Sequence, residues 1–281
     1  MKTYRQIVHD LQLVYPENEA RSLARWLCEE RFGLNQTDIL LDKDNQLSAD
    51  DIKVVREITS RLINHEPIQY ILGETVFCGH RFTAAPGALI PRPETQELVA
   101  HVLRRVQESP ARSILDVGTG SGCIALSLAL ALPEAEVVGW DVSPDALAIA
   151  RHNAERYPEA HVRLEQADIF NPPQDDRQWD LIVSNPPYVC ESEARQMERN
   201  VLQYEPHLAL FVPDDNPLRY YRAILWYAMS HLVPEGSIFF EINQALGAEM
   251  CHLIEYFGFR DIEIMQDDFG RNRFAKCRRP S

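Results

Sequence analysis

A regular alternation of apolar, strand-like segments with helical segments is the feature that most constrains the fold of this chain. From about residue 97 onward, we expect strands at residues 113–117, 136–140, 161–164, 181–184 and 237–242. Helical stretches fall between most of these segments, at residues 122–132, 144–156 and 217–232. Strands that alternate with helices form a parallel sheet covered on both faces. The pattern therefore predicts a doubly wound, mostly parallel α/β domain, with an antiparallel hairpin from residues 261–265 and 273–277 at the sheet edge.

The chain before residue 76 has a different pattern, with helical spacing and no strand-like alternation. Ser48 precedes Asp51 by three residues and stands just ahead of an apolar stripe, which is typical of a helix start. A second stripe around Trp26 is ended by Gly33. Between the two regions, the prolines of residues 90–95 exclude a helix interior. We therefore expect a small N-terminal helical domain at residues 1–75, a hairpin and linker at 76–96, and the α/β domain at 97–281.

Charge and cysteine usage limit the partners of this chain. Lys and Arg total 28 and Asp and Glu total 42, which gives a formal net charge of -14. A field of this sign repels phosphate backbones, so we expect no direct nucleic-acid binding. The six cysteines are scattered without a C-x-x-C pair or nearby ligand histidines, which predicts reduced thiols and no metal site. With no signal peptide pattern and no apolar run long enough to cross a bilayer, we expect a cytoplasmic protein without a membrane anchor.

Residues 113–122, Ser-Ile-Leu-Asp-Val-Gly-Thr-Gly-Ser-Gly, are typical of a strand that turns through three alternate glycines into a helix. Glycine is needed in such a turn because the turn is tight and a ligand must approach the backbone closely. Cys123 stands where a dinucleotide fingerprint has its third glycine, and Asp116 would oppose a pyrophosphate but suits the positive end of S-adenosylmethionine. The loop therefore favours a sulfonium cofactor over a dinucleotide. The cofactor contacts expected here are Asp116, Gly118, Thr119, Gly120, Ser121 and Gly122.

Two further acids follow expected strands. Asp141 ends the second strand, where a carboxylate accepts hydrogen bonds from both ribose hydroxyls. Asp168 follows the third strand, where it would accept from the adenine amino group, with Ile169 beside the ring. The simpler alternative is that both acids only cap the following helices. The cofactor roles are favoured over capping at both positions.

The segment Asn185, Pro186, Pro187 and Tyr188 is the most specific feature of the sequence. It follows the buried strand at residues 181–184, at the carboxyl edge of the sheet where α/β ligands bind. An amide nitrogen is a poor nucleophile because its lone pair is delocalised, and no ordinary side chain deprotonates it. The side-chain oxygen of Asn185 and the carbonyl oxygen of Pro186 can accept its two protons and leave the lone pair facing a methyl donor. Asn185 would thus contact both cofactor and substrate, and both bonds strengthen as the nitrogen becomes positive.

The prolines and the tyrosine fit the same chemistry. Pro186 has a fixed φ and no N–H, and Pro187 biases it toward an extended conformation, so the Pro186 carbonyl is aimed by the chain itself. Tyr188 would stack on the planar group that is methylated. The alternative is a rigid turn after a strand, which Asn-Pro-Pro also makes. Its position after an Asp-x-Gly-x-Gly-x-Gly loop favours the catalytic interpretation.

With these residues the chain resembles the protein-(glutamine-N5) methyltransferases of the release-factor type, often called the HemK family. The resemblance covers nearly the full length, and its marks are residues 66–73 (Glu-Pro-Ile-Gln-Tyr-Ile-Leu-Gly), 89–95 (Leu-Ile-Pro-Arg-Pro-Glu-Thr), 116–122, 185–188 and 204–210 (Tyr-Glu-Pro-His-Leu-Ala-Leu). It implies a class I S-adenosylmethionine-dependent methyltransferase domain with a Rossmann-like fold. It also implies that the substrate is the glutamine in the Gly-Gly-Gln loop of peptide chain release factors. From the residues alone the helical domain is either a packing appendage or a docking surface, and the resemblance implies that it helps to recognise the substrate.

The chain departs from the family pattern at three places. Asn243 stands where family members often carry glycine, Ile169 stands where an aromatic residue is common, and residues 212–217 lack the expected glycines.

Rival functions also remain. An adenine or cytosine amino methyltransferase of nucleic acid would use the same Asn-Pro-Pro-Tyr segment, but it needs a flipped base and a basic groove, which the net charge opposes. A glutamine methyltransferase of a ribosomal protein is separated mainly by the linker at residues 90–95, and a cofactor-binding protein without catalysis is disfavoured by the intact Asn185.

Overall fold

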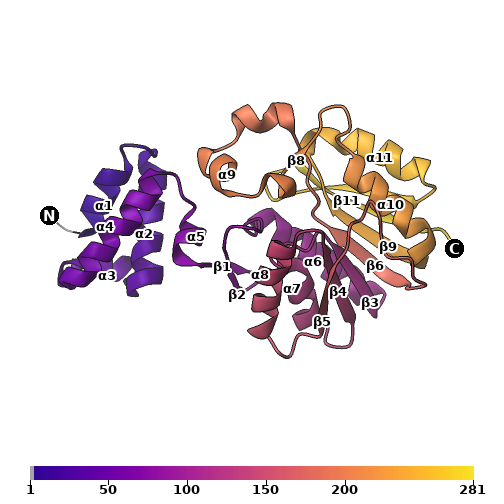
Figure 1. The fold of residues 1–281 in the computed structure, drawn as a ribbon, viewed down its shortest axis with the longest axis horizontal. Coiled ribbons are helices and arrows are strands. Elements are labelled where there is room, and N and C mark those ends of the chain that lie inside the picture. The colour runs from indigo at the N-terminus through magenta and orange to yellow at the C-terminus, as the bar shows by residue number, and fades with distance from the viewer. Residues whose placement is uncertain (1–2) are drawn as a thin grey trace. The chain divides into compact units, whose positions relative to one another are not determined.

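The structure is a computed structural model that describes residues 3–281. Residues 1 and 2, with which the expected helical domain begins, lie outside this range. The chain divides into two compact units, which are described separately below (Figure 1). The first unit takes in the chain up to Glu74 together with Glu198–Tyr204, and the second takes in Thr75–Met197 and Glu205–Ser281.

The first unit is helical. The expected helix start at Ser48 is confirmed, because Ser48 and Asp51 form a capping box at the beginning of α4, and Gly33, with φ of 66°, ends α2. The inclusion of residues 198–204 was not expected: Tyr204 donates a hydrogen bond of 3.0 Å to the carbonyl oxygen of Asn64. The elements are α1 (Thr3–Leu11), α2 (Glu17–Phe32), α3 (Gln36–Leu40), η1 (Lys43–Gln46), α4 (Ala49–Ile63), α5 (Ile68–Leu72) and α9 (Arg199–Tyr204).

A twisted sheet of seven strands forms the centre of the second unit, in the order β10-β11-β9-β6-β3-β4-β5. The five strands from β9 to β5 run parallel and the hairpin β10–β11 is antiparallel, so both the doubly wound sheet and the edge hairpin are confirmed. The strands are β3 (Ser113–Val117), β4 (Glu136–Asp141), β5 (Val162–Gln166), β6 (Trp179–Ser184), β9 (Leu232–Glu241), β10 (Arg260–Gln266) and β11 (Asn272–Arg278).

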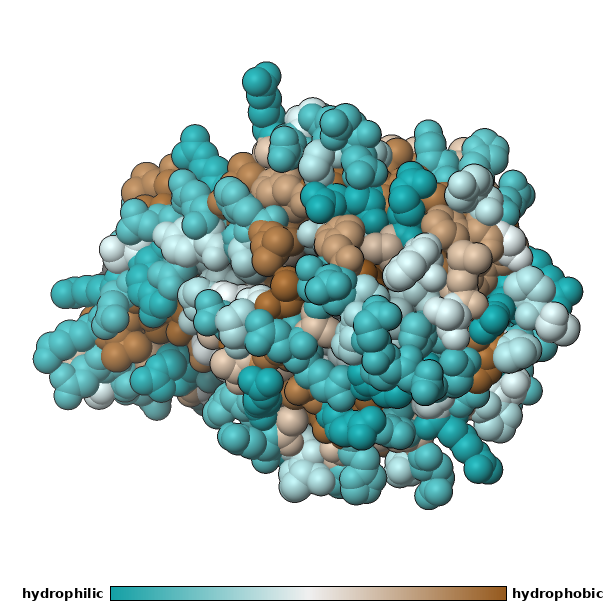
Figure 2. Space-filling model, turned by 45° about the vertical axis from the view of Figure 1, so that its right-hand side comes forward, coloured by the Kyte–Doolittle hydropathy of each residue, from teal (hydrophilic) through white to brown (hydrophobic). Residues whose placement is uncertain are grey.

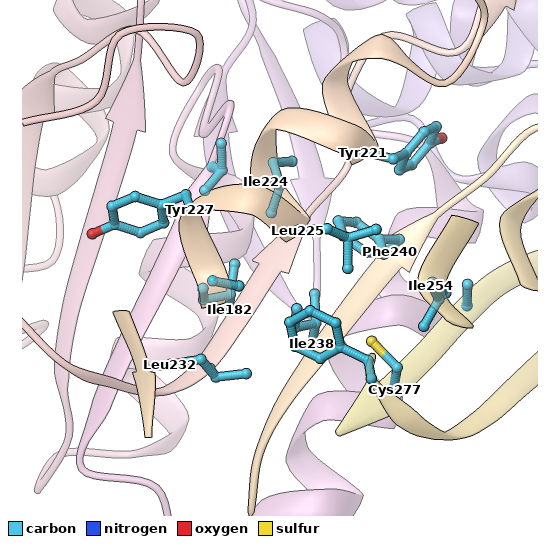
Figure 3. Packing of buried hydrophobic residues seen from close by; sticks show 14 of the residues in the cluster. Ile182, Tyr221, Ile224, Leu225, Tyr227, Leu232, Ile238, Phe240, Ile254 and Cys277 are labelled. Atoms are coloured by element: carbon cyan, nitrogen blue, oxygen red, sulfur yellow. The ribbon is translucent and has the colours of Figure 1, made fainter. Parts of the chain in front are cut away.

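Helices cover both faces of this sheet. Successive residues of each strand point to opposite sides, and the apolar side chains on each side pack against helices. In β6, Leu181 and Val183 join one apolar cluster with α6 and α7. Ile182, which lies between them, joins the other cluster with α10 and α11 (Figure 3). Figure 3 shows the second cluster, in which Tyr221 and Tyr227 of α10 lie over the sheet. The helices of this unit are α6 (Pro93–Glu108), α7 (Cys123–Ala131), α8 (Pro144–Glu155), α10 (Arg219–His231) and α11 (Gly247–Tyr256), with the short η2 (Glu191–Gln196), η3 (His207–Ala209) and η4 (Gln244–Leu246).

Two smaller strand pairs lie outside this sheet. β1 (Glu74–Phe77) pairs with β2 (His80–Thr83), and β7 (Val189–Cys190) pairs in parallel with β8 (Phe211–Val212). The segment expected to be a linker as far as residue 96 becomes helical earlier, since α6 begins at Pro93. Proline excludes a helix interior but suits the first helical position, where its missing N–H is not needed.

The face of the molecule seen in Figure 2 is mostly hydrophilic, with apolar residues in small groups. None of the helices in residues 3–281 is both long enough and apolar enough to cross a bilayer.

Candidate active site

A cavity of about 420 Å³ opens at the carboxyl ends of β3, β4 and β6. The chain runs from β3 outward to β4 and β5 and then returns with β6 on the other side of β3, so this is the point where the strand order reverses. Open α/β sheets bind ligands at such a point, in pockets of this size. Among the residues singled out from the sequence, those that line the cavity are Gly118, Thr119, Gly120, Ser121, Asp141, Asp168, Ile169, Asn185, Pro186 and Pro187.

The three loop glycines have two different tasks. Gly118 and Gly120 have φ of 76° and 57°, and a Cβ at either would meet nothing within 4 Å. Their backbone is therefore open to a ligand. Gly122, with φ of 80°, does not line the cavity; a Cβ there would lie 3.2 Å from both the Ala150 Cβ and the Leu126 Cδ1. The third glycine allows close packing of α7 against α8, and this geometry does not support the cofactor contact that was expected at Gly122.

Asp116 lies elsewhere than expected. Its side chain is fully buried and does not line the cavity. Its Oδ2 accepts hydrogen bonds from the Thr119 hydroxyl (2.7 Å) and the Ala125 N–H (3.2 Å), while Oδ1 has no partner. Burial raises the pKa of this carboxyl to about 7. Asp116 therefore fixes the turn from β3 into α7, and this geometry does not support the expected direct contact with the cofactor.

Asp141 lies in the cavity wall, where the ribose role was expected, and it also binds backbone N–H groups on both sides of it. It lines the cavity at the end of β4, and its oxygens accept hydrogen bonds from the N–H groups of Gly120 (2.8 Å) and Ser143 (2.9 Å). The carboxylate thus ties the glycine loop to the start of α8, whose cap is Ser143. Burial raises the pKa of Asp141, and these backbone bonds oppose the rise. Each carboxylate oxygen has a second lone pair, so acceptors remain for a ligand.

The end of the cavity near Asp168 contains aromatic residues that sequence reasoning missed. Asp168 lines the cavity and accepts a hydrogen bond of 2.9 Å from the Phe170 N–H; no helix begins between β5 and β6, so it is not a helix cap. The rings of Phe170 and Tyr220 lie 5.0 Å apart, and the Arg219 guanidinium lies 4.6 Å from the Phe170 ring centroid. All three also line the cavity. Phe170, next to Ile169, was the available signal for this aromatic surface, since the family commonly has an aromatic residue at the position of Ile169.

Asn185 also lines the cavity and is held by residues that are distant in sequence. Its side-chain Nδ2 donates to the Thr95 hydroxyl oxygen at 3.1 Å. The Thr95 hydroxyl in turn donates to Glu241 Oε2 at 2.7 Å, and Tyr188 donates to Glu241 Oε1 at 2.9 Å. Glu241 is 1% exposed at the end of β9. Burial raises the pKa of Glu241, while the bonds from Thr95 and Tyr188 and the charge of Arg273 oppose the rise.

Tyr188 is not placed as expected. It does not line the cavity, and its ring packs against the apolar cluster of α10 and α11. Burial and then the Glu241 carboxylate raise the pKa of Tyr188, so its hydroxyl stays protonated and donates. Asn243, one of the departures from the family pattern, donates to the Tyr188 carbonyl oxygen at 3.2 Å and to Glu193 Oε2 at 2.9 Å. Tyr188 and Asn243 therefore anchor the loop that follows Asn185.

An ion pair closes the same side of the cavity. Arg92 and the buried Glu205 approach to 2.5 Å, and Glu205 also accepts a hydrogen bond of 3.0 Å from the Ile90 N–H. The cavity is lined by Arg92 and Ile90, and by Pro206, which directly follows Glu205. Sequence reasoning named the segments 89–95 and 204–210 only as marks of a resemblance. The sequence did show Glu205 between an aromatic residue and a proline. Nothing in that segment, however, indicates that Glu205 pairs with Arg92.

This sheet, with its glycine loop, acid-ended second strand and Asn-Pro-Pro segment at one cavity, defines the chain as a class I methyltransferase. Two solved structures share the fold: a methyltransferase from Pyrococcus furiosus (TM-score 0.51, 17% identity, 71% of this chain and 89% of that chain) and a 16S rRNA N2 G1207 methyltransferase from Thermus thermophilus in complex with AdoMet and guanosine (TM-score 0.52, 20% identity, 73% and 49%).

The family follows from closer relatives. Family models describe residues 3–73 as a PrmC N-terminal domain and residues 95–205 as a methyltransferase small domain. The chain is 47% identical to a release factor glutamine methyltransferase of Bacteroides thetaiotaomicron over 97% of its own length and 98% of the relative's. It is 40% identical to that of Flavobacterium psychrophilum over 98% of both chains. The chain belongs to the release factor glutamine methyltransferase family.

Proposed function

We propose that this methyltransferase transfers a methyl group from S-adenosylmethionine to the side-chain amide nitrogen, N5, of the glutamine in the Gly-Gly-Gln motif of peptide chain release factors. The observation that carries the proposal is the presence of Asn185, Pro186 and Pro187 in the wall of the same cavity as the glycine loop. This substrate implies a cytoplasmic encounter, because release factors act on ribosomes.

The residues of the cavity fit this cofactor. The backbone at Gly118 and Gly120 is open, which suits the approach of a ligand chain. Asp141 and Asp168 supply carboxylate acceptors for ribose hydroxyls and an adenine amino group, and Phe170 and Tyr220 supply apolar surface for the ring. S-adenosylmethionine, when bound, supplies an electrophilic methyl group on a positively charged sulfur. The negative charges of Asp141 and Asp168 favour such a cation, although Asp116 does not face the cavity.

The chain's own residues supply orientation and acceptors. Asn185 offers its side-chain oxygen and Pro186 its carbonyl oxygen to the two N–H bonds of the substrate amide. These acceptors hold the nitrogen with its lone pair directed away from them, and they bind more strongly as positive charge develops on it. Pro187 and the anchored Tyr188 keep this loop rigid, so little reorganisation is needed during the reaction. No residue has to remove a proton from the neutral amide before attack. The bond from methyl to nitrogen would form as the bond from methyl to sulfur breaks, and one N–H proton would then leave the nitrogen to solvent.

The helical part of the chain belongs to this proposal as the substrate-recognition domain. It is supported by the match of residues 3–73 to a domain model that is separate from the methyltransferase model. A long protein substrate needs contacts beyond the reacting side chain to be selected from other exposed glutamines.

Mass spectrometry of a purified bacterial release factor, incubated with this protein and S-adenosylmethionine, tests the proposal. The expected result is one added methyl group on the Gly-Gly-Gln peptide, and none when that glutamine is replaced by alanine. Methyl transfer to DNA, RNA or a ribosomal protein, with none to release factors, would reject this assignment in favour of one of its rivals.

A further inference from the structure

Four side chains from separate parts of the second unit form one hydrogen-bonded chain at the cavity, whose wall includes Thr95 and Asn185. Glu241 ends β9, Thr95 lies in the first turn of α6, and Asn185 and Tyr188 follow β6. Glu241 accepts from Tyr188 on one oxygen and from Thr95 on the other, and Thr95 accepts from Asn185. Thr95 is 3% exposed and Glu241 is 1% exposed, so water does not compete for these bonds.

The direction of these bonds matters because a hydroxyl has a single proton. The Thr95 proton is used on Glu241, 2.7 Å away, so the Thr95 oxygen is left as an acceptor toward Asn185. Only the NH2 end of the Asn185 amide can donate to that oxygen, at 3.1 Å. The carbonyl end of the amide, Oδ1, therefore stays on the other side as a free acceptor. A reversed hydroxyl would attract Oδ1 and turn N–H groups toward a substrate that also carries N–H groups.

We propose that Thr95 and Glu241 are positioning residues, a carboxylate-to-hydroxyl relay that fixes which end of the Asn185 amide faces the substrate. The inference rests on the proposed function, in which Asn185 must accept a proton of the substrate amide. Glu241 is an acceptor on both oxygens because Tyr188 occupies the second one. The relay also explains a carboxylate buried at the end of a sheet strand, where an unpaired charge would be costly.

The orientation can be measured without cofactor or substrate. In isotope-labelled protein, the Asn185 side-chain NH2 protons should show nuclear Overhauser contacts to the Thr95 methyl group, since Nδ2 lies on the Thr95 side. The NH2 signals are assigned by their loss in Asn185→Asp. Absence of these contacts, with contacts only to protons on the cavity side, would overturn the inference whatever the activity of the protein.

Turnover provides the second test. Thr95→Val removes the hydroxyl without changing the side chain's shape. We expect kcat toward a purified release factor to fall at least about tenfold, because removing a preorganised polar contact lowers kcat by this order or more. KM for the release factor and the dissociation constant of S-adenosylmethionine should stay within about twofold, because Thr95 acts through Asn185. Thr95→Ser keeps the hydroxyl and should restore kcat. Glu241→Gln, which exchanges one acceptor for a donor, should lower kcat in the same direction.

A double-mutant cycle separates positioning from a structural role. In an Asn185→Ala background, Thr95→Val should cause no further loss of kcat, because the side chain that it orients is absent. Ser237→Ala, which removes a buried hydroxyl from the same strand as Glu241, is the matched control and should keep parental turnover. Parental turnover in Thr95→Val, or additive losses in the cycle, would overturn the relay. A parent protein that methylates no release factor would instead reject the proposed function.

Discussion

Asp116 offers the sharpest test of the electrostatics of this fold. The carboxyl is fully buried between β3 and α7, and one of its oxygens has no hydrogen-bond partner. Asp116→Asn keeps the shape and an oxygen that accepts from Thr119 and Ala125, but it removes the group that titrates. We expect this change to remove a part of the pH dependence of unfolding.

The size and sign of this pH dependence follow from the raised pKa of Asp116. Burial raises the pKa of Asp116 from 3.8 to about 7, helped by the nearby negative charge of Asp141. The folded state therefore holds its proton to higher pH than the unfolded state, so the stabilising contribution is complete below the unfolded pKa and is lost as pH rises through about 7. The full shift is on the order of 4 kcal/mol, of which about 2 kcal/mol is lost between about pH 5.5 and pH 8.

Urea unfolding of the protein without cofactor, followed by tryptophan fluorescence at several pH values, measures this difference. Trp140 and Trp179 are buried in the apolar cluster of the same unit and report its unfolding. Relative to the parent, Asp116→Asn should gain about 2 kcal/mol in free energy of unfolding as pH rises from about 5.5 to 8. Asp145→Asn, at an exposed carboxyl on α8, controls for the loss of one negative charge. A constant difference between parent and Asp116→Asn across this range would refute the reasoning.

Three further changes probe the cavity and its frame. Asn185→Ala should lower kcat about a hundredfold while S-adenosylmethionine still binds, measured by steady-state kinetics and titration calorimetry; parental turnover would contradict the role of its side-chain oxygen. Asp141→Ala should raise the dissociation constant of S-adenosylmethionine at least about tenfold in the same calorimetry, because both a ligand acceptor and the tie to the Gly120 N–H are lost; unchanged affinity would exclude the ribose role. Gly122→Ala should lower the free energy of unfolding by more than the about 1 to 2 kcal/mol of a left-handed alanine. Gly258→Ala, at φ of 79° with nothing within 4 Å, isolates that backbone cost, and equal losses in the two variants would show that packing against Ala150 is unimportant.

The sequence by itself determined the parts of this protein that depend on neighbours along the chain. Strand and helix periodicity predicted the parallel sheet and its edge hairpin, because each element must bury one face or both. The glycine loop, Asp141 and the Asn-Pro-Pro segment were found because each directly follows a strand, and parallel strands end at one edge. Local chemistry was thus enough to bring Gly118, Asp141 and Asn185 to one cavity.

Only the tertiary structure decided which side chains face that cavity and which support it from behind. Asp116 and Tyr188 stand in the expected motifs, yet both point into the protein. Thr95 and Glu241 meet across 146 positions of sequence, and Arg92 and Glu205 across 113. Such pairings depend on how α6 docks on the sheet and on the register of β9 beside β6, which are set by packing of whole elements. Burial and hydrogen-bond direction are properties of those contacts, so no pattern within one segment encodes them.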